Sequence, residues 1–285
     1  MRALADFIMR GRTQAAVVAL IGSWFPLISP ATVALVTLRR GTTDGSMILL
    51  WALLPAVLAF FVSDMGPLMP VVTILGLVAT YAVALLLRSS ASWPQLLVGL
   101  VALSTLGALL LASFVPDPVQ ALTTSLGEML EQMQAQAPEG AAIEVPTEVF
   151  VVGLIAYVIA INSLFSLLLA RWWQALLYNP GGFQTEFHQL RLKPAAAITS
   201  LVTTAYCMSV GGDYQLWGSL FMLPLLLAGV AIVHRVVAAR RLGVQWLVLF
   251  YMALVLFNPI VMMVLTVIAF LDTWLNFRGR LREKP

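Results

Sequence analysis

The stretch EVFVVGLIAYVIAINSLFSLLLAR, residues 148–171, decides the fold of this chain. Residues 149–170 carry no charged side chain, and most of them are aliphatic or aromatic. About 20 apolar residues in a helix are enough to cross the hydrocarbon core of a bilayer. In lipid the backbone polar groups must be paired within the segment, which a helix achieves. The stretch therefore predicts a helix that crosses a membrane.

The whole chain has the composition of a membrane protein. Of its 285 residues, 61% are hydrophobic and 10% are charged, and the mean hydropathy is +0.95. Soluble domains carry about 25% charged residues. The sequence lacks the short alternating segments of a transmembrane barrel. It predicts an all-α, polytopic transmembrane helical bundle, a single integral membrane domain over residues 1–285. Six ordinary spans are expected, at 46–63, 67–88, 92–115, 148–171, 195–211 and 214–234.

Proline breaks two further apolar segments, one at each end of the chain. Residues 13–38 contain Pro26 and Pro30, and residues 243–278 contain Asn258-Pro259. Proline inside a helix removes a hydrogen bond and kinks or breaks the helix. Because each segment has basic residues near both ends, we expect a hairpin that begins and ends on one side of the membrane. A single kinked span is the alternative.

Basic residues set the orientation of the spans. From Ser89 to Ala170 there is no Lys or Arg, and acidic residues gather in the loop at 116–147. Lys and Arg are enriched in cytoplasmic loops. The loop at 116–147 is therefore expected to be extracytoplasmic, and both termini and an elbow at 179–194 to be cytoplasmic. The formal net charge of +3 comes from these span ends, so the lipid bilayer, and no nucleic acid, is the expected partner.

Two short amphipathic surface helices are expected outside the spans. In the outer loop, Asp117 and Pro118 begin a helix with one apolar stripe, formed by Val119, Leu122, Leu126, Met129 and Met133. In the elbow, Phe183, Phe187 and Leu190 lie at positions i, i+4 and i+7 after an Asn-Pro-Gly-Gly turn. These three side chains predict a helix that contacts lipid or docks a partner protein.

No motif in the sequence indicates catalysis. The chain has no phosphate-binding loop, no HExxH zinc motif and no G-x-S-x-G. Its single cysteine, Cys207, excludes an intramolecular disulfide and a cysteine-based zinc cluster. Glu186 and His188 are two residues apart and so lie on different helix faces. We expect no enzyme, no cofactor and no metal site, unless Glu186, His188, Asp272 and Arg278 converge on one cleft.

Uncharged polar residues in the middle of two spans are candidate ligands for a small molecule. Asn162, Ser163 and Ser166 share a face of the span at 148–171, and Thr203 and Tyr206 lie in the span at 195–211. Together they predict a solute cavity within the membrane. The alternative is that these side chains form hydrogen bonds between helices.

Small residues in the first apolar segment allow close approach of another helix. Ala15 and Ala19 are four residues apart and so lie on one face. Such a stripe predicts either internal packing or a docking face for a membrane coupling subunit.

Two stretches carry a resemblance to a known family. RWWQALLYNPGGFQTEFHQLRL at 171–192 and AFLDTWLNFRGR at 269–280 resemble the YybS-like family of predicted bacterial inner-membrane proteins. That family is distantly similar to the substrate-binding S subunits of energy-coupling-factor vitamin transporters. The resemblance implies a location in the bacterial inner membrane and a compact helical core that binds one small molecule. It also implies a coupling partner, for which the spacing of Ala15 and Ala19 is suitable. The extra terminal segments and the long outer loop depart from the S-subunit pattern.

Two functions follow as hypotheses. The first is a non-enzymatic subunit that binds or transports a small solute and takes energy from a partner, since the chain has no nucleotide-binding loop. The second is a membrane scaffold or assembly factor that docks a cytoplasmic protein through the elbow at 179–194 and the basic C-terminal tail.

Overall fold

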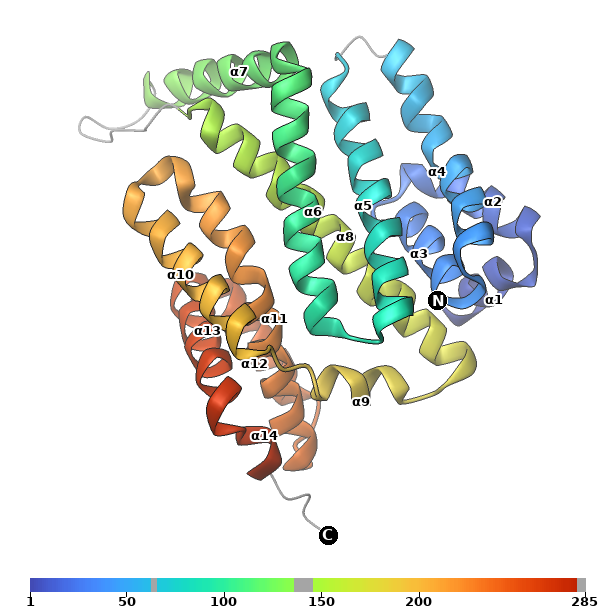
Figure 1. Cartoon of the computed structure of the whole chain (residues 1–285), viewed down its shortest axis with the longest axis vertical. Helices are drawn as coiled ribbons and strands as arrows, with labels where there is room; N and C mark the ends of the chain where they lie inside the picture. The colour runs from blue at the N-terminus through green and yellow to red at the C-terminus, as the bar shows by residue number, and fades with distance from the viewer. Residues whose placement is uncertain (63–65, 136–145, 281–285) are drawn as a thin grey trace.

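The computed structural model describes residues 1–62, 66–135 and 146–280, and within these ranges the chain contains helices and turns but no strand. Figure 1 shows the arrangement. The α-helices are α1 (Arg2–Arg10), α2 (Arg12–Ile21), α3 (Ile28–Arg40), α4 (Thr42–Val62), α5 (Leu68–Ser90), α6 (Trp93–Phe114), α7 (Pro116–Ala135), α8 (Glu148–Tyr178), α9 (Gly182–His188), α10 (Pro194–Val210), α11 (Gln215–Ala239), α12 (Gln245–Leu256), α13 (Asn258–Leu275) and α14 (Phe277–Arg280). Two short 3₁₀ turns, η1 (Gly22–Trp24) and η2 (Gly212–Tyr214), precede α3 and α11.

Six helices in the described ranges are long and apolar enough to cross a membrane, which confirms the membrane class. They are Thr42–Val62, Leu68–Ser90, Trp93–Phe114, Glu148–Tyr178, Gly212–Ala239 and Asn258–Leu275. Five of them coincide with predicted spans. The sixth prediction, 195–211, corresponds to α10, which has only 17 residues and is shorter than these six. In its place, α13 from the proline-broken C-terminal segment reaches the length of a span.

The stretch 148–171 forms most of α8, which packs on helices that precede it and that follow it in the chain. In Figure 1, α8 runs diagonally through the molecule, and it contacts α3, α5, α6 and α11. Thr147 caps its N-terminus by accepting a hydrogen bond from the Phe150 N–H. The helix continues past the predicted end at Arg171 to Tyr178, because Trp172 to Tyr178 contain no glycine or proline that would end it. Asn179-Pro180 then stops it.

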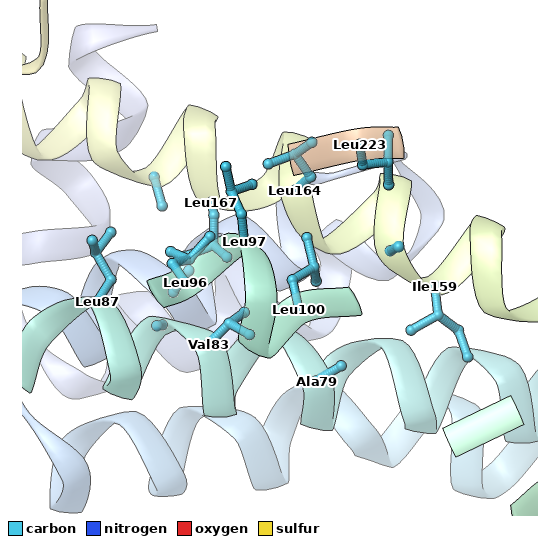
Figure 2. Close-up of a cluster of buried hydrophobic side chains, with 14 of the residues drawn as sticks. Ala79, Val83, Leu87, Leu96, Leu97, Leu100, Ile159, Leu164, Leu167 and Leu223 are labelled. Atoms are coloured by element: carbon cyan, nitrogen blue, oxygen red, sulfur yellow. The ribbon is translucent and has the colours of Figure 1, made fainter. Parts of the chain in front are cut away.

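A leucine-rich core joins α8 to the helices beside it. Figure 2 shows side chains of α5, α6, α8 and α11 meeting in one cluster. All its labelled residues are buried: Ala79, Val83, Leu87, Leu96, Leu97, Leu100, Ile159, Leu164, Leu167 and Leu223. Lipid tails are as apolar as leucine, so close van der Waals packing, rather than transfer from water, holds such helices together. This core fixes α11 against α8.

Each proline-broken segment folds as two helices. Pro26 lies in the turn between α2 and α3, where Leu27 has a φ of 70°, and Pro30 lies in the first turn of α3. Pro259 lies in the first turn of α13, directly after the break at Phe257. Proline is tolerated in a first turn because its missing N–H has no partner there. The two helices of each pair pack on one another.

The helix expected in the outer loop is α7. It lies across the upper end of the bundle in Figure 1 and packs on α6 and α8. Val119 is buried and Leu122 is half-buried, but Met129 and Met133 at the other end of the stripe are exposed. The stripe therefore contacts the bundle through Val119, Leu122 and Leu126, and not through its two methionines. Residues 136–145 of the predicted loop lie outside the described residues.

Arginines near the ends of several helices lie together at the opposite end of the bundle, which we call the basic end. Arg88 Nη1 donates to the Leu38 carbonyl oxygen at 2.6 Å, which joins the ends of α5 and α3. The Arg39 guanidinium lies 4.1 Å from the centre of the Tyr178 ring, which joins α3 to the end of α8. In Figure 1, α9 and α14 lie toward this end.

Candidate functional site

The mid-membrane polar residues on α8 are used for packing between and within helices. Ser163 is buried; its Oγ accepts a hydrogen bond from Thr80 Oγ1 at 2.9 Å and donates to the Gly76 carbonyl at 3.3 Å. Ser166 Oγ donates to Asn162 Oδ1 at 3.3 Å, and Asn162 is exposed on the outer surface of the bundle. Ser163 therefore makes the interhelical hydrogen bonds that were the alternative to a solute cavity.

The predicted partners on α10 do not meet them. Thr203 Oγ1 donates to the Thr199 carbonyl of its own helix at 2.7 Å, and Tyr206 is 64% exposed. Helix α11 packs on both α8 and α10 and lies between them. Asn162, Ser163, Ser166, Thr203 and Tyr206 line neither of the two cavities described below, and the solute cavity expected among them stays a prediction.

The small-residue stripe of the first segment is also internal. Ala15 and Ala19 are buried, and α2 packs on α3 and α4. A helix of this chain thus already covers the face that the stripe offers. Within this chain Ala15 and Ala19 allow close packing and offer no free surface to a coupling subunit.

The apolar stripe of the elbow faces the protein. The Phe183 ring lies 5.9 Å from the Trp93 ring of α6, and the Phe187 ring lies 5.5 Å from the His234 ring of α11. Leu190 is buried. The stripe of Phe183, Phe187 and Leu190 therefore packs on two helices of its own chain, and its role in docking a partner stays a prediction.

The other face of the elbow lines a cavity, which we call the cationic cavity. Its volume is about 620 Å³, and it lies between the elbow, α11 and α14. The residues that line it are Gln184, Thr185, His188, Gln189, Arg191, Arg235, Ala238, Asn276, Arg278 and Gly279. Among the described residues, this lining contains three arginines and no carboxylate.

Arg278 is held by groups from three elements. Its side chain is 8% exposed; Nη1 donates to the His188 carbonyl at 3.0 Å and Nη2 donates to the Ala228 carbonyl at 2.9 Å. Nε lies 3.1 Å from Asp272 Oδ2, which makes an ion pair, although the N–H is not aligned for a hydrogen bond. A guanidinium has five N–H donors. Arg278 therefore ties α14 to the elbow and to α11, and its side chain lines the cavity.

The end of α13 explains this arrangement. Asn276 adopts a left-handed conformation with φ of 47°, which asparagine tolerates, and the chain turns there. The fully buried Asp272 then accepts a 2.7 Å hydrogen bond from the Phe277 N–H. A carboxylate at a helix C-terminus is unfavourable beside the helix dipole, so the Arg278 cation compensates for it. Burial lowers the pKa of Arg278 to about 10, while Asp272 opposes that shift and Arg191 adds to it. Arg278 therefore stays charged at neutral pH.

The other two arginines come from separate elements. Arg191, in the loop after α9, donates from Nη2 to the Thr273 carbonyl at 3.2 Å. Arg235 lies near the end of α11. The cavity is thus surrounded by cations from the elbow, α11 and α14. Guanidinium groups match phosphate and carboxylate oxygens through paired hydrogen bonds, so this lining is suited to an anion.

His188 contributes a neutral imidazole. Burial lowers the pKa of His188 below its ordinary value of 6.5, and the nearby His234, Arg235 and Arg278 add to the shift. At neutral pH the ring is uncharged and can both donate and accept a hydrogen bond.

The pH dependence of stability follows from this shift. The unfolded chain binds the His188 proton at a higher pH than the folded chain, so acid favours the unfolded state. The stability that His188 contributes is therefore present above pH 6.5 and is lost as the pH falls toward the lowered pKa. We expect the thermal unfolding midpoint of the wild type to fall more than that of His188→Gln between about pH 7 and about pH 5. An equal fall of the unfolding midpoint in the two proteins would contradict the lowered pKa of His188.

Of the four residues that would indicate catalysis if they met in one cleft, His188, Asp272 and Arg278 lie together. His188 and Arg278 line the cavity, and Asp272 pairs with Arg278. Glu186 does not join them, because both of its carboxylate oxygens accept hydrogen bonds from Arg171 of α8. With Asp272 buried in an ion pair and Glu186 turned away, the cluster is suited to binding rather than proton transfer. Among the described residues no three His, Cys, Asp or Glu side chains could hold a metal ion.

Sequence reasoning missed the participation of Arg191, Arg235, Gln184, Gln189 and Asn276. They come from three separate segments of the chain, the elbow, α11 and the turn after α13, and these segments meet only because the elbow folds back against α11 and α14. One signal was present. Basic residues cluster after His188, around Arg235 and after Asn276, and the orientation rule put all three clusters on one side of the membrane.

A second cavity of about 620 Å³, the apolar cavity, lies between α11, α12 and α13. Its lining is entirely apolar: Gly229, Ile232, Val233, Val236, Val237, Leu242, Trp246, Leu249, Phe250, Leu265, Ile268 and Phe277. Val233 and Val237 lie on the face of α11 opposite to Arg235. Helix α11 therefore separates this space from the cationic cavity.

Comparison with family models, with curated proteins and with solved structures found no match to this chain. The resemblance of 171–192 and 269–280 to the YybS-like family stays a prediction. The functional argument therefore rests on the cavity itself.

Proposed function

We propose that this chain is a multi-pass protein of the bacterial inner membrane that binds a small anionic solute in the cationic cavity, without catalysing a reaction. The observation that carries the proposal is the meeting of Arg191, Arg235 and Arg278 around one space of about 620 Å³. Pockets of roughly 300–1,000 Å³ are typical of small-molecule sites. The hypothesis that the chain binds a small solute is thereby kept, but the proposed site lies at the basic end of the bundle and not in the middle of the membrane.

The fixed positions of the arginines support a binding role. Arg278 donates to two backbone carbonyls and Arg191 to a third, so their guanidinium groups are already oriented before a ligand arrives. Preorganised donors lose little conformational entropy on binding. Charge-assisted hydrogen bonds from such groups contribute about 1.5–3 kcal/mol each.

The orientation rule places this cavity on the cytoplasmic side, together with both termini. In that orientation the pairs α2/α3 and α12/α13 would be short hairpins that enter and leave the membrane from the cytoplasm. The solute would be received from, or delivered to, the cytoplasm. Active transport would need a partner subunit or an ion gradient, because the sequence has no nucleotide-binding loop. The scaffold hypothesis has less support, since the elbow stripe packs on its own chain.

Removing one arginine tests the proposal. We expect Arg191→Gln to weaken sulfate binding about 10- to 100-fold, the loss of one charge-assisted hydrogen-bonding group. The measurement is isothermal titration calorimetry on the full chain in phosphatidylcholine nanodiscs. Sulfate is a suitable probe because it keeps two negative charges across the working pH range.

Lys193→Gln is the matched control. Lys193 is exposed and carries the same charge two residues further along the loop, but it does not line the cavity. Its replacement should change the affinity less than about threefold, as expected for an exposed charge outside the site. Equal losses in the two variants, or no sulfate binding to the wild type, would contradict the proposed site.

A further inference from the structure

The apolar cavity follows one face of α11 toward the basic end. Its lining on that helix is Gly229, Ile232, Val233, Val236 and Val237, at positions i, i+3, i+4, i+7 and i+8. At a rise of about 1.5 Å per residue, the cavity extends roughly 12 Å along the helix axis. One leaflet of a bilayer is half of a hydrocarbon core of about 30 Å. Because α11 belongs to a helix long enough to span the membrane, the cavity runs as a lipid acyl chain does, over most of one leaflet.

Helix α12 closes the cavity without being buried itself. None of its residues is buried, although Trp246, Leu249 and Phe250 line the cavity. Helices α11 and α13, by contrast, meet closely, since a Cβ added to Gly229 would lie 2.6 Å from the Leu265 carbonyl oxygen. Large empty spaces are rare in packed proteins, because the atoms around them lose dispersion contacts. In a bilayer an acyl chain can fill such a space, and the apolar lining suits one.

Two arginines lie beside this cavity where α11 ends. Leu242 lines the cavity, and Arg240 and Arg241 directly precede it in the turn after α11. Both arginine side chains are exposed, and among the described residues neither has a hydrogen-bond or ion-pair partner. Trp246 lines the cavity from the first turn of α12, and tryptophan is enriched where a membrane meets water. This end of the cavity is therefore at the level of the lipid headgroups.

We propose that the apolar cavity binds an acyl chain of an anionic phospholipid, whose phosphate group lies at Arg240 and Arg241. The charge of the two arginines selects this occupant. Basic residues next to a membrane helix attract anionic lipid headgroups, whereas a lipid without net charge would leave the two cations without a counterion. The site lies on the other side of α11 from the cationic cavity and goes beyond the proposed function.

The test is native mass spectrometry of the full chain, released from nanodiscs with equal amounts of phosphatidylglycerol and phosphatidylcholine. We expect the wild type to retain the anionic phosphatidylglycerol about tenfold more often than phosphatidylcholine, as two basic residues at a headgroup would produce. Arg240→Gln combined with Arg241→Gln should abolish most of that preference. Arg2→Gln combined with Lys193→Gln is the matched control, because it also removes two exposed cations but neither lines the cavity. The control should keep the wild-type preference.

A further variant and a crosslinking experiment test the place of the acyl chain. Val233→Phe puts a larger side chain into the apolar cavity and should lower the retention of both lipids severalfold. In the wild type, phosphatidylglycerol with a photoreactive diazirine on its acyl chain should crosslink to residues 229–237 of α11. That measurement needs no variant, so it remains decisive if Val233→Phe does not fold.

Three outcomes would overturn the proposal. They are equal retention of the two lipids by the wild type, an unchanged preference after loss of Arg240 and Arg241, and acyl-chain crosslinks that avoid residues 229–237. None of them bears on anion binding in the cationic cavity, which the sulfate titration tests separately.

Discussion

Replacing Arg278 with methionine should lower the free energy of unfolding by about 3–5 kcal/mol, the usual cost of breaking a buried ion pair by removing one partner. Arg278 is 8% exposed and Asp272 is fully buried, so water cannot replace the lost cation at the carboxylate. The carbonyls of His188 and Ala228 would lose their donors as well. A buried acceptor without a partner adds to the cost.

The measurement is chemical unfolding of the purified protein in mixed micelles. A second variant separates the charge from the packing: Asp272→Asn combined with Arg278→Met removes both charges, and it should recover part of the loss because no unpaired carboxylate remains. Arg10→Met is the surface control, since Arg10 pairs with Asp6 on an exposed face of α1. A loss of less than about 1 kcal/mol for Arg278→Met, as for an exposed ion pair, would show that Arg278 does not hold the basic end together.

Replacing Trp217 with alanine should lower the free energy of unfolding by about 3 kcal/mol, within the range measured for large-to-small changes at buried aromatic residues. Trp217 is 8% exposed, and its Nε1–H donates to the Val149 carbonyl of α8 at 3.0 Å. Its ring packs on Gly153, where an added Cβ would lie only 2.8 Å from the ring. Trp217 thus joins α11 to α8, and through α8 to the helices before it.

Two further variants check this account of the α8–α11 contact. Gly153→Ala should also destabilise the protein, because the new methyl group would force the indole away from α8. Trp274→Ala removes an indole that is 49% exposed, and it should cost clearly less than Trp217→Ala because little packing is lost. Similar losses for Trp217→Ala and Trp274→Ala in the same unfolding experiment would contradict the role of Trp217.

Much of the fold could be predicted because the bilayer leaves few solutions. Long uncharged stretches such as 148–171 must be helical in lipid, so five spans and the class of protein followed from length and hydropathy. The helix α7 followed from the spacing of Val119 and Leu122. All of these are local properties.

The site could not be predicted, because it depends on contacts between distant segments. Asn162 and Tyr206 were chosen for polarity at mid-span, but which face of a helix meets a neighbour is decided by tertiary packing, and α11 came to lie between them. The elbow was predicted to be a short amphipathic helix with Phe183, Phe187 and Leu190 on one face; α9 contains Phe183 and Phe187 but ends at His188, so Leu190 lies in the loop after it. The sequence does not say whether such a face meets lipid, a partner or its own chain. Once it packs on α6 and α11, the opposite face must line the space beside Arg278.

The most direct test of the central claim is a crystal structure of the full chain grown with selenate, a dianion whose selenium scatters anomalously. We predict an anomalous peak inside the cationic cavity, within hydrogen-bonding distance of the guanidinium groups of Arg191, Arg235 and Arg278. The peak should be lost in Arg191→Gln and kept in Lys193→Gln. A map with no peak in the cavity, or with peaks only at exposed arginines such as Arg10, would contradict the claim that this membrane protein binds an anion there.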